Sequence, residues 1–253
     1  MASIQLNRGE LRAYFRAPLT PLLCVLLCLL CAALGGCSQR SEEARNGGGL
    51  RGSSSTSSAG GELPQHRWVF LGDSLTAGYG LAAEDAYPHL LAEAFELRGL
   101  PWKVQNAGVS GDTSAGALRR LDWLLADAPA AEGGRVHTLF ICVGANDGLR
   151  GQPISALEAN LVALIEQAKG RGVRVILAGM KIPTNMGAAY RARFEESYRT
   201  VAERLEVPLM PFLLEGVAGT PALNLDDGIH PNGEGHRAVA TGVLRFLEAE
   251  GLL

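Results

Sequence analysis

The chain has 253 residues, of which 47% are hydrophobic and 19% are charged, and these proportions are typical of a globular protein with a full-sized core. Its formal net charge is −3, and its arginines and lysines are scattered along the sequence. A nucleic acid or another polyanion is therefore not an expected partner.

The first 36 residues differ in character from the rest. Arg8, Arg12 and Arg16 precede an apolar run of 13 residues, Leu22–Leu34. This order predicts a secretory signal peptide, because a membrane-spanning helix needs about 20 apolar residues. An uncleaved membrane anchor is the alternative. The next letters, "LGGC", resemble a bacterial lipobox, and this resemblance implies that Cys37 is lipidated and becomes the new N-terminus.

Residues 37–65 are expected to form a flexible linker that tethers a soluble domain to the membrane. The stretch from Ser38 to Glu62 is rich in Gly and Ser and has no aromatic residue. Because the residue after Cys37 is Ser38 and not Asp, the lipobox resemblance implies the periplasmic face of the bacterial outer membrane.

Cysteine positions agree with this division of the chain. Four of the five cysteines lie in residues 1–37, which leaves Cys142 alone in the domain. Neither an internal disulfide nor a paired-cysteine metal site is expected. Cys142 lies in the apolar run "TLFICVG", where it is expected to be a small core side chain.

Residues 66–253 alternate between short apolar runs and longer amphipathic segments, as expected for one α/β domain. The predicted strands are Arg67–Gly72, Trp102–Gly108, His137–Gly144, Val173–Gly179 and Val207–Phe212. The predicted helices are Ala86–Arg98, Ser114–Ala126, Ser155–Lys169, Ala188–Leu205 and Gly235–Glu250. This alternation predicts right-handed βαβ crossovers and a five-stranded parallel sheet that helices cover on both faces.

Polar residues follow the predicted strands at the edge where open α/β sheets carry their active sites. Ser74 follows the first strand in "GDSL", Asn146 follows the third in "GAND", and His230 stands before the last helix in "DGIHP". A serine hydroxyl needs an adjacent base to act as a nucleophile, and His230 is the best candidate. Asp227, three residues before His230, can orient the imidazole, although Asp226 is also within reach by sequence.

Acyl transfer also needs donors for the developing oxyanion. We expect them to be the backbone N–H of Ser74 at a helix start, the N–H of Gly108, and the side-chain amide of Asn146. Each residue has a simpler alternative, since Ser74 can merely cap a helix and "NDG" alone is typical of a turn. His66, His89, His137 and His236 lack a carboxylate at this spacing and are expected to be non-catalytic.

The pieces "GDSL", Gly108, "GAND" and "DGIHP" resemble the four blocks of the SGNH, or GDSL, hydrolase family, over essentially the whole domain. "KIPTNMGAAYRARFEESY" and "VPLMPFLLEGV" are similar to its thioesterase, arylesterase and lysophospholipase branch. The resemblance implies a flavodoxin-like three-layer α/β/α sandwich. It also implies a serine esterase that uses Ser74, His230 and Asp227, forms an acyl-enzyme, and needs no metal or cofactor. It also implies that the loop "GLRGQP" lines the acyl pocket, and Leu149 and Ile182 are candidate apolar contacts or else core residues.

Two other functions stay open. One is a carbohydrate O-acetylesterase that acts on envelope polysaccharide, and the other is a non-catalytic lipoprotein that binds acylated ligands. No "G-x-S-x-G" elbow and no Walker A or "GxGxxG" motif is present, which argues against an α/β-hydrolase fold and a nucleotide enzyme. The expected substrate is a small-molecule or lipid acyl ester, and the expected state is a monomer.

Overall fold

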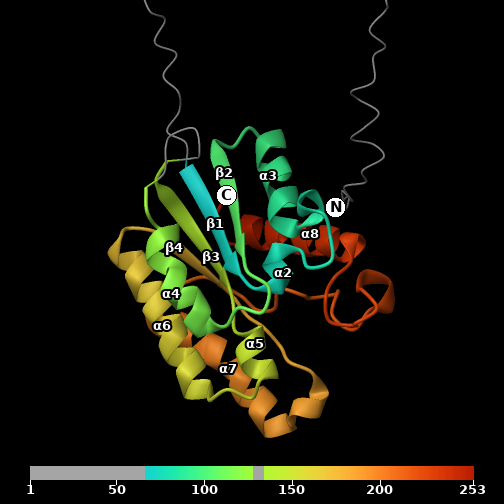
Figure 1. The fold of residues 1–253 in the computed structure, drawn as a ribbon. Coiled ribbons are helices and arrows are strands. Elements are labelled where there is room, and N and C mark those ends of the chain that lie inside the picture. The colour runs from blue at the N-terminus through green and yellow to red at the C-terminus, as the bar shows by residue number, and fades with distance from the viewer. Residues whose placement is uncertain (1–65, 128–133) are drawn as a thin grey trace, which may run out of the picture. The chain divides into compact units, whose positions relative to one another are not determined.

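The computed structural model describes residues 66–127 and 134–253, so the predicted signal peptide, Cys37 and the linker lie outside the described residues. Within them, five strands form one parallel sheet in the order β2-β1-β3-β4-β5 (Figure 1). The strands are β1 (His66–Gly72), β2 (Trp102–Gly108), β3 (Val136–Cys142), β4 (Arg174–Ala178) and β5 (Leu209–Met210). This confirms the predicted five-stranded parallel sheet.

The central strands are apolar along their length because both faces of the sheet are covered. In β1, Trp68, Val69, Phe70 and Leu71 are fully buried. The edge strand β2 is only partly buried, and β5 is reduced to two residues. The core therefore lies on both sides of β1 and β3, and these two strands end beneath the candidate site.

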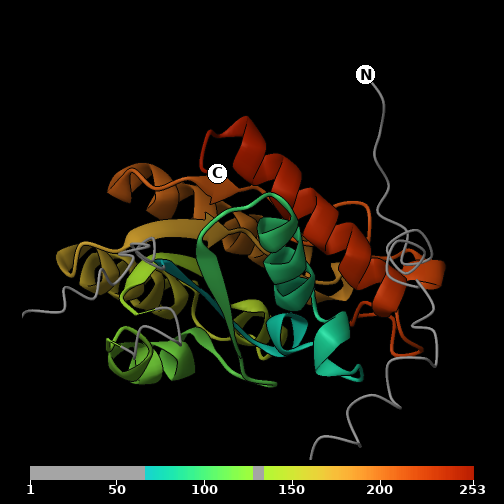
Figure 2. The ribbon, with the colours of Figure 1, turned by 90° about the horizontal axis from the view of Figure 1, so that it is seen from above.

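Helices cover the sheet in two groups, as the two views show (Figures 1 and 2). On one face, α3 (Tyr87–Leu97) packs against α8 (Gly233–Ala249). On the other, α4 (Ser114–Leu124) packs against α6 (Ile154–Gly170), which packs against α7 (Ala188–Leu205). Each predicted helix begins and ends within two residues of the observed one.

Two short helices lie at the carboxyl ends of central strands; the helix start at Ser74 is confirmed, and the second helix was not predicted. Helix α2 (Ser74–Ala77) follows β1, and α5 (Ala145–Leu149) follows β3. The chain leaves β1 toward β2 on one side and later enters β3 on the other side. In open α/β sheets, ligands bind beyond the strand ends at the point where the chain reverses direction in this way.

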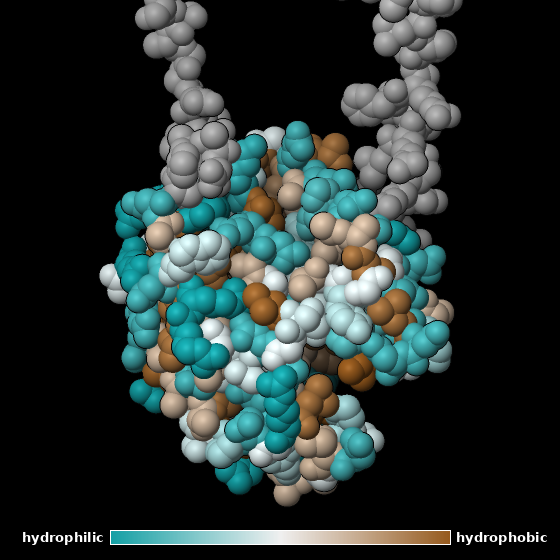
Figure 3. Space-filling model, viewed as in Figure 1, coloured by the Kyte–Doolittle hydropathy of each residue, from teal (hydrophilic) through white to brown (hydrophobic). Residues whose placement is uncertain are grey.

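No helix among the described residues is long and apolar enough to cross a membrane. The face of the molecule seen in Figure 3 is mostly hydrophilic, with apolar side chains in small separate patches.

Candidate active site

Ser74 is the first residue of α2, directly beyond the end of β1. The residue that caps the helix is Asp73, whose Oδ1 accepts the backbone N–H of Leu75 at 3.0 Å. Asp73 is 1% exposed, whereas Ser74 is partly exposed. Because Asp73 supplies the N-cap hydrogen bond of α2, Ser74 is not the capping residue. The hydroxyl of Ser74 is therefore available for other contacts.

His230 is held in a short loop that turns back on itself before α8. The N–H of Leu225 donates to the carbonyl of His230 at 2.8 Å, and Asn224 pairs with Pro231 in an antiparallel bridge. Immediately after the loop, Asn232 caps α8. The loop that carries the imidazole is therefore anchored by backbone contacts at both of its ends.

Ser74, His230 and Asp227 lie in one hydrogen-bonded line. Nε2 of His230 is 2.9 Å from Oγ of Ser74, and Nδ1 is 2.6 Å from Oδ2 of Asp227. Oδ1 of Asp227 accepts the N–H groups of His230 and Ile229, both at 3.0 Å. These backbone donors and the imidazole lower the pKa of Asp227 to about 2. The neighbouring Asp226 is exposed. The carboxylate that contacts the imidazole is that of Asp227 and not that of Asp226.

Asn146 enters the site from α5. Its Nδ2 donates to the carbonyl of Asp112 at 2.9 Å and to Oδ2 of Asp73 at 3.4 Å. The next residue, Asp147, is buried and accepts from the N–H and the hydroxyl of Ser114 at 2.9 and 2.5 Å. Asp147 therefore joins α5 to the start of α4. This link holds Asn146 next to Asp73, the residue that caps α2.

The structure corrects the prediction that Gly108 offers its N–H to the substrate. That N–H already donates to Oδ1 of Asn106 at 2.9 Å. Gly108 is required for a different reason, because a Cβ there would lie 2.1 Å from the backbone nitrogen of Ala77 in α2. Three residues further on, Gly111 has φ of +80° and its N–H has no acceptor among the described residues.

The turn that contains Gly111 is braced by two arginines. Arg120 donates to Oδ2 of Asp112 at 2.8 Å and to the carbonyl of Gly72 at 3.0 Å. Arg150 donates to the carbonyl of Gly111 at 2.9 Å. The turn is thus joined both to the end of β1 and to the segment after α5, so its backbone is held in place beside Asn146.

Apolar side chains gather at this edge of the sheet. Of the six exposed large hydrophobic residues among those described, four lie in segments next to the site: Tyr79, Val109, Leu149 and Ile229. Leu149 is thus exposed, as a substrate contact must be. Ile182 is not, because it is 4% exposed and packs beneath Gly148 of α5, so this candidate belongs to the core.

Several titratable side chains are buried beneath the site. Burial raises the pKa of Asp73 to about 6 and raises the pKa of the Cys142 thiol far above its usual range. Cys142 is 1% exposed, which confirms its prediction as a core residue. His236 is also buried, and its Nδ1 accepts the N–H of Tyr87 at 3.2 Å.

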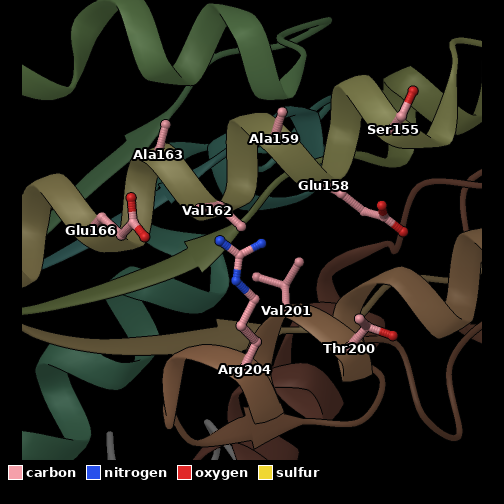
Figure 4. A pocket seen from close by; sticks show the side chains of 9 residues that line it. All are labelled: Ser155, Glu158, Ala159, Val162, Ala163, Glu166, Thr200, Val201 and Arg204. Carbon is pink, nitrogen blue, oxygen red and sulfur yellow. The ribbon is translucent and has the colours of Figure 1, made fainter.

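A groove of about 490 Å³ lies elsewhere, between α6 and α7 (Figure 4). Its lining residues are Ser155, Glu158, Ala159, Val162, Ala163, Glu166, Thr200, Val201 and Arg204. Ser74, Asp227 and His230 do not line this groove. Among the described residues, no group of three or more His, Cys, Asp or Glu side chains is placed to hold a metal ion.

The fold and the hydrogen-bonded serine, histidine and aspartate define a hydrolase of three-layer α/β/α architecture. The profile of the GDSL-like lipase/acylhydrolase family matches residues 70–238, and the chain belongs to this family.

Three relatives have named functions. The chain is 39% identical to "Esterase TesA" of Pseudomonas aeruginosa over 163 residues, covering 64% of this chain and 78% of that protein. It is 38% identical to "Arylesterase" of Vibrio mimicus, covering 71% and 86%. It is 34% identical to "Thioesterase 1/protease 1/lysophospholipase L1" of Escherichia coli K12, covering 71% and 82%.

Solved structures confirm the fold. The crystal structure of TesA matches with a TM-score of 0.68 at 36% identity, covering 74% of this chain and all of that one. The structure of the psychrotrophic esterase EstA from Pseudoalteromonas sp., inhibited by monoethylphosphonate, matches with a TM-score of 0.67 at 32% identity, covering 73% and 98%. The SGNH hydrolase fold predicted from the sequence is therefore confirmed.

Proposed function

We propose that this chain is a serine esterase that hydrolyses acyl esters through a covalent acyl-enzyme. Oγ of Ser74 attacks the ester carbonyl while Nε2 of His230 takes its proton, along the 2.9 Å contact between them. The resulting imidazolium gives the proton to the leaving alcohol. Water then attacks the acyl-enzyme by the same route and releases the acid.

Asp227 makes this proton transfer possible in two ways. By accepting from Nδ1 it holds the tautomer that leaves Nε2 free to act as a base, and its charge stabilises the imidazolium. Because its pKa is about 2, the Asp227 carboxyl is ionised at neutral pH. The carboxylate is itself fixed by the backbone N–H groups of Ile229 and His230.

We assign the oxyanion donors to the N–H of Ser74, the N–H of Gly111 and the amide of Asn146. Gly111 replaces Gly108 in this assignment because Asn106 occupies the N–H of Gly108. The carbonyl of Asp112 takes one N–H of Asn146 at 2.9 Å, and the other, which has only a long 3.4 Å contact with Oδ2 of Asp73, is the one that turns to the oxyanion. Such donors are typically worth about 10²–10³ in turnover each.

The observation that carries the proposal is the line of two hydrogen bonds from Ser74 through His230 to Asp227. The names of the relatives, which include an esterase, an arylesterase and a lysophospholipase, support ester hydrolysis. The apolar residues Tyr79, Val109, Leu149 and Ile229 beside the site favour an acyl chain over an acetylated sugar.

We propose further that the enzyme is anchored in the bacterial envelope through lipidated Cys37, on the periplasmic face of the outer membrane. The supporting observation is the sequence alone: arginines, an apolar run and "LGGC". In such a place esters or lysophospholipids are the better physiological substrates, because acyl-CoA thioesters belong to the cytoplasm. Mass spectrometry of the N-terminal peptide, with Cys37→Ala as control, tests the anchor.

The catalytic proposal is tested by Ser74→Ala, assayed with aryl esters of increasing acyl length. We expect hydrolysis to fall by at least about 10³-fold while the melting temperature is retained. The matched control is Ser155→Ala, which removes an exposed serine of α6 and should leave the rate unchanged. Retained activity in Ser74→Ala would show that Ser74 is not the nucleophile. A preference for acetyl sugars over longer acyl chains supports the alternative function.

A further inference from the structure

The ring of Tyr79 lies against the imidazole of His230. Their centroids are 4.5 Å apart and the two planes are inclined by 36°. The imidazole nitrogens are occupied by Ser74 and Asp227, so the hydrogen bonds fix the edges of the ring, and Tyr79 packs on its face. The side chain of His230 is only 17% exposed, although its loop is at the surface.

Ser74 and Tyr79, two of the contacts of His230, come from helix α2 and the turn that follows it. Helix α2 begins at Ser74 and ends at Ala77, and its C-cap residue Gly78 has φ of +78°. The chain then turns so that the N–H of Tyr79 donates to the carbonyl of Ser74 at 3.1 Å. Tyr79 is 50% exposed, and its hydroxyl has no hydrogen-bond partner among the described residues. The ring, and not the hydroxyl, is therefore the part of Tyr79 that this arrangement uses.

We propose that Tyr79 is a positioning residue for His230. Its ring holds the imidazole between Ser74 and Asp227, and its π face stabilises the imidazolium that forms when His230 accepts the proton of Ser74. An aromatic face within about 6 Å of a cation attracts it, and the attraction is stronger where water is excluded. Because the charge appears only in the transition state, this contact acts on kcat and not on KM. The inference rests on the proposed function.

The test compares Tyr79→Phe with Tyr79→Leu. Phenylalanine keeps the ring, so its kcat should stay within about twofold of the wild type. Leucine keeps apolar bulk but has no π face, so kcat should fall by about three- to tenfold with KM unchanged. Trp123→Leu is the matched control, because it removes a 73% exposed ring near the far end of α4 and should change neither constant.

A second measurement does not depend on turnover. The ring current of Tyr79 should shift the proton resonances of the His230 ring, and this shift should persist in Tyr79→Phe and vanish in Tyr79→Leu. Equal losses of kcat in both variants would assign the effect to the hydroxyl and overturn the proposal. A rise in KM at constant kcat would make Tyr79 a substrate contact only, which also overturns it. An inactive wild type would instead defeat the proposed function, and the positioning role would fall with it.

Discussion

Nε2 of His230 lies 2.9 Å from Oγ of Ser74, although 156 positions separate the two residues in the chain. The contact depends on two tertiary arrangements. Helix α2 presents Ser74 at the end of β1, and the bridged loop before α8 brings His230 over it. A hydroxyl and a base at this distance in the free enzyme need no rearrangement before proton transfer, which is the entropic advantage of a preformed site.

Asp227→Asn should reduce kcat by about 10²–10⁴-fold without unfolding the protein. The amide can still accept the N–H groups of Ile229 and His230, so the loop is kept. It carries no charge, however, and its NH₂ group can donate to Nδ1, which favours the wrong imidazole tautomer. Steady-state kinetics measures the loss. Asp226→Asn is the matched control, and an equal loss in that variant would contradict the assignment of Asp227.

Asn146→Ala should lower kcat by about 10²–10³-fold, with a smaller effect on KM. The side chain lies within hydrogen-bond reach of the Asp112 carbonyl, and its second N–H is the one assigned to the oxyanion. Steady-state kinetics with an aryl ester measures the change. A variant whose KM rises while kcat is kept would show that Asn146 binds the ground state instead.

Asn106→Ala distinguishes the two glycines. Removing Asn106 frees the N–H of Gly108. If Gly111 is the donor, kcat should stay within about twofold of the wild type, because the hole is unchanged. If Gly108 were the donor, removal of its competing acceptor should raise kcat. An increase of tenfold or more would return the assignment to Gly108.

Gly108→Ala and Gly111→Ala should differ in stability. A Cβ at Gly108 meets the backbone of α2 at 2.1 Å, and backbone cannot move aside cheaply, so we expect a loss of about 3 kcal/mol. At Gly111 the nearest atom is 3.7 Å away, and only the left-handed backbone conformation is penalised, by about 1–2 kcal/mol. Urea denaturation measures both losses. Equal losses would mean that close approach is not the reason for glycine at position 108.

The sequence was sufficient to predict the sheet and the long helices, because buried parallel strands and amphipathic helices leave strong periodic patterns. The position of Ser74 at a strand end followed from the same patterns, whereas the strand order comes from the structure. Helices α2 and α5 left no such pattern, since a helix of four or five residues is stabilised by tertiary contacts, here the Asp73 cap and the Asp147 link to α4.

The errors in the site have a common physical cause. Which glycine N–H is free depends on where one side chain, Asn106, directs its oxygen. Whether Ile182 lines a pocket or packs beneath Gly148 depends on how α5 sits on the sheet. Neither fact is encoded in residue type or spacing. The contact of Tyr79 with His230 was not predicted either, because these residues are far apart in sequence and only the tertiary fold brings them together.

Asp73 and His236 should impose opposite pH dependences on the free energy of unfolding. Burial raises the pKa of Asp73 to about 6 from 3.8 in the unfolded chain, so the folded protein binds more protons in this range. Its contribution therefore falls as pH rises, by on the order of 3 kcal/mol in all. Burial lowers the pKa of His236 from 6.5 to about 4, so the unfolded chain binds more protons there and stability rises with pH.

Asp73→Asn should separate the two effects. The amide oxygen can still accept the N–H of Leu75, so the cap of α2 is kept while the titrating carboxyl is lost. Wild type should vary little between about pH 4 and 6, since the two contributions oppose each other there. In the variant the His236 contribution remains, so the free energy of unfolding should rise with pH across that range. Urea titrations at several pH values and constant ionic strength measure this slope. A variant with the slope of the wild type would show that Asp73 keeps its ordinary acidity in the folded protein.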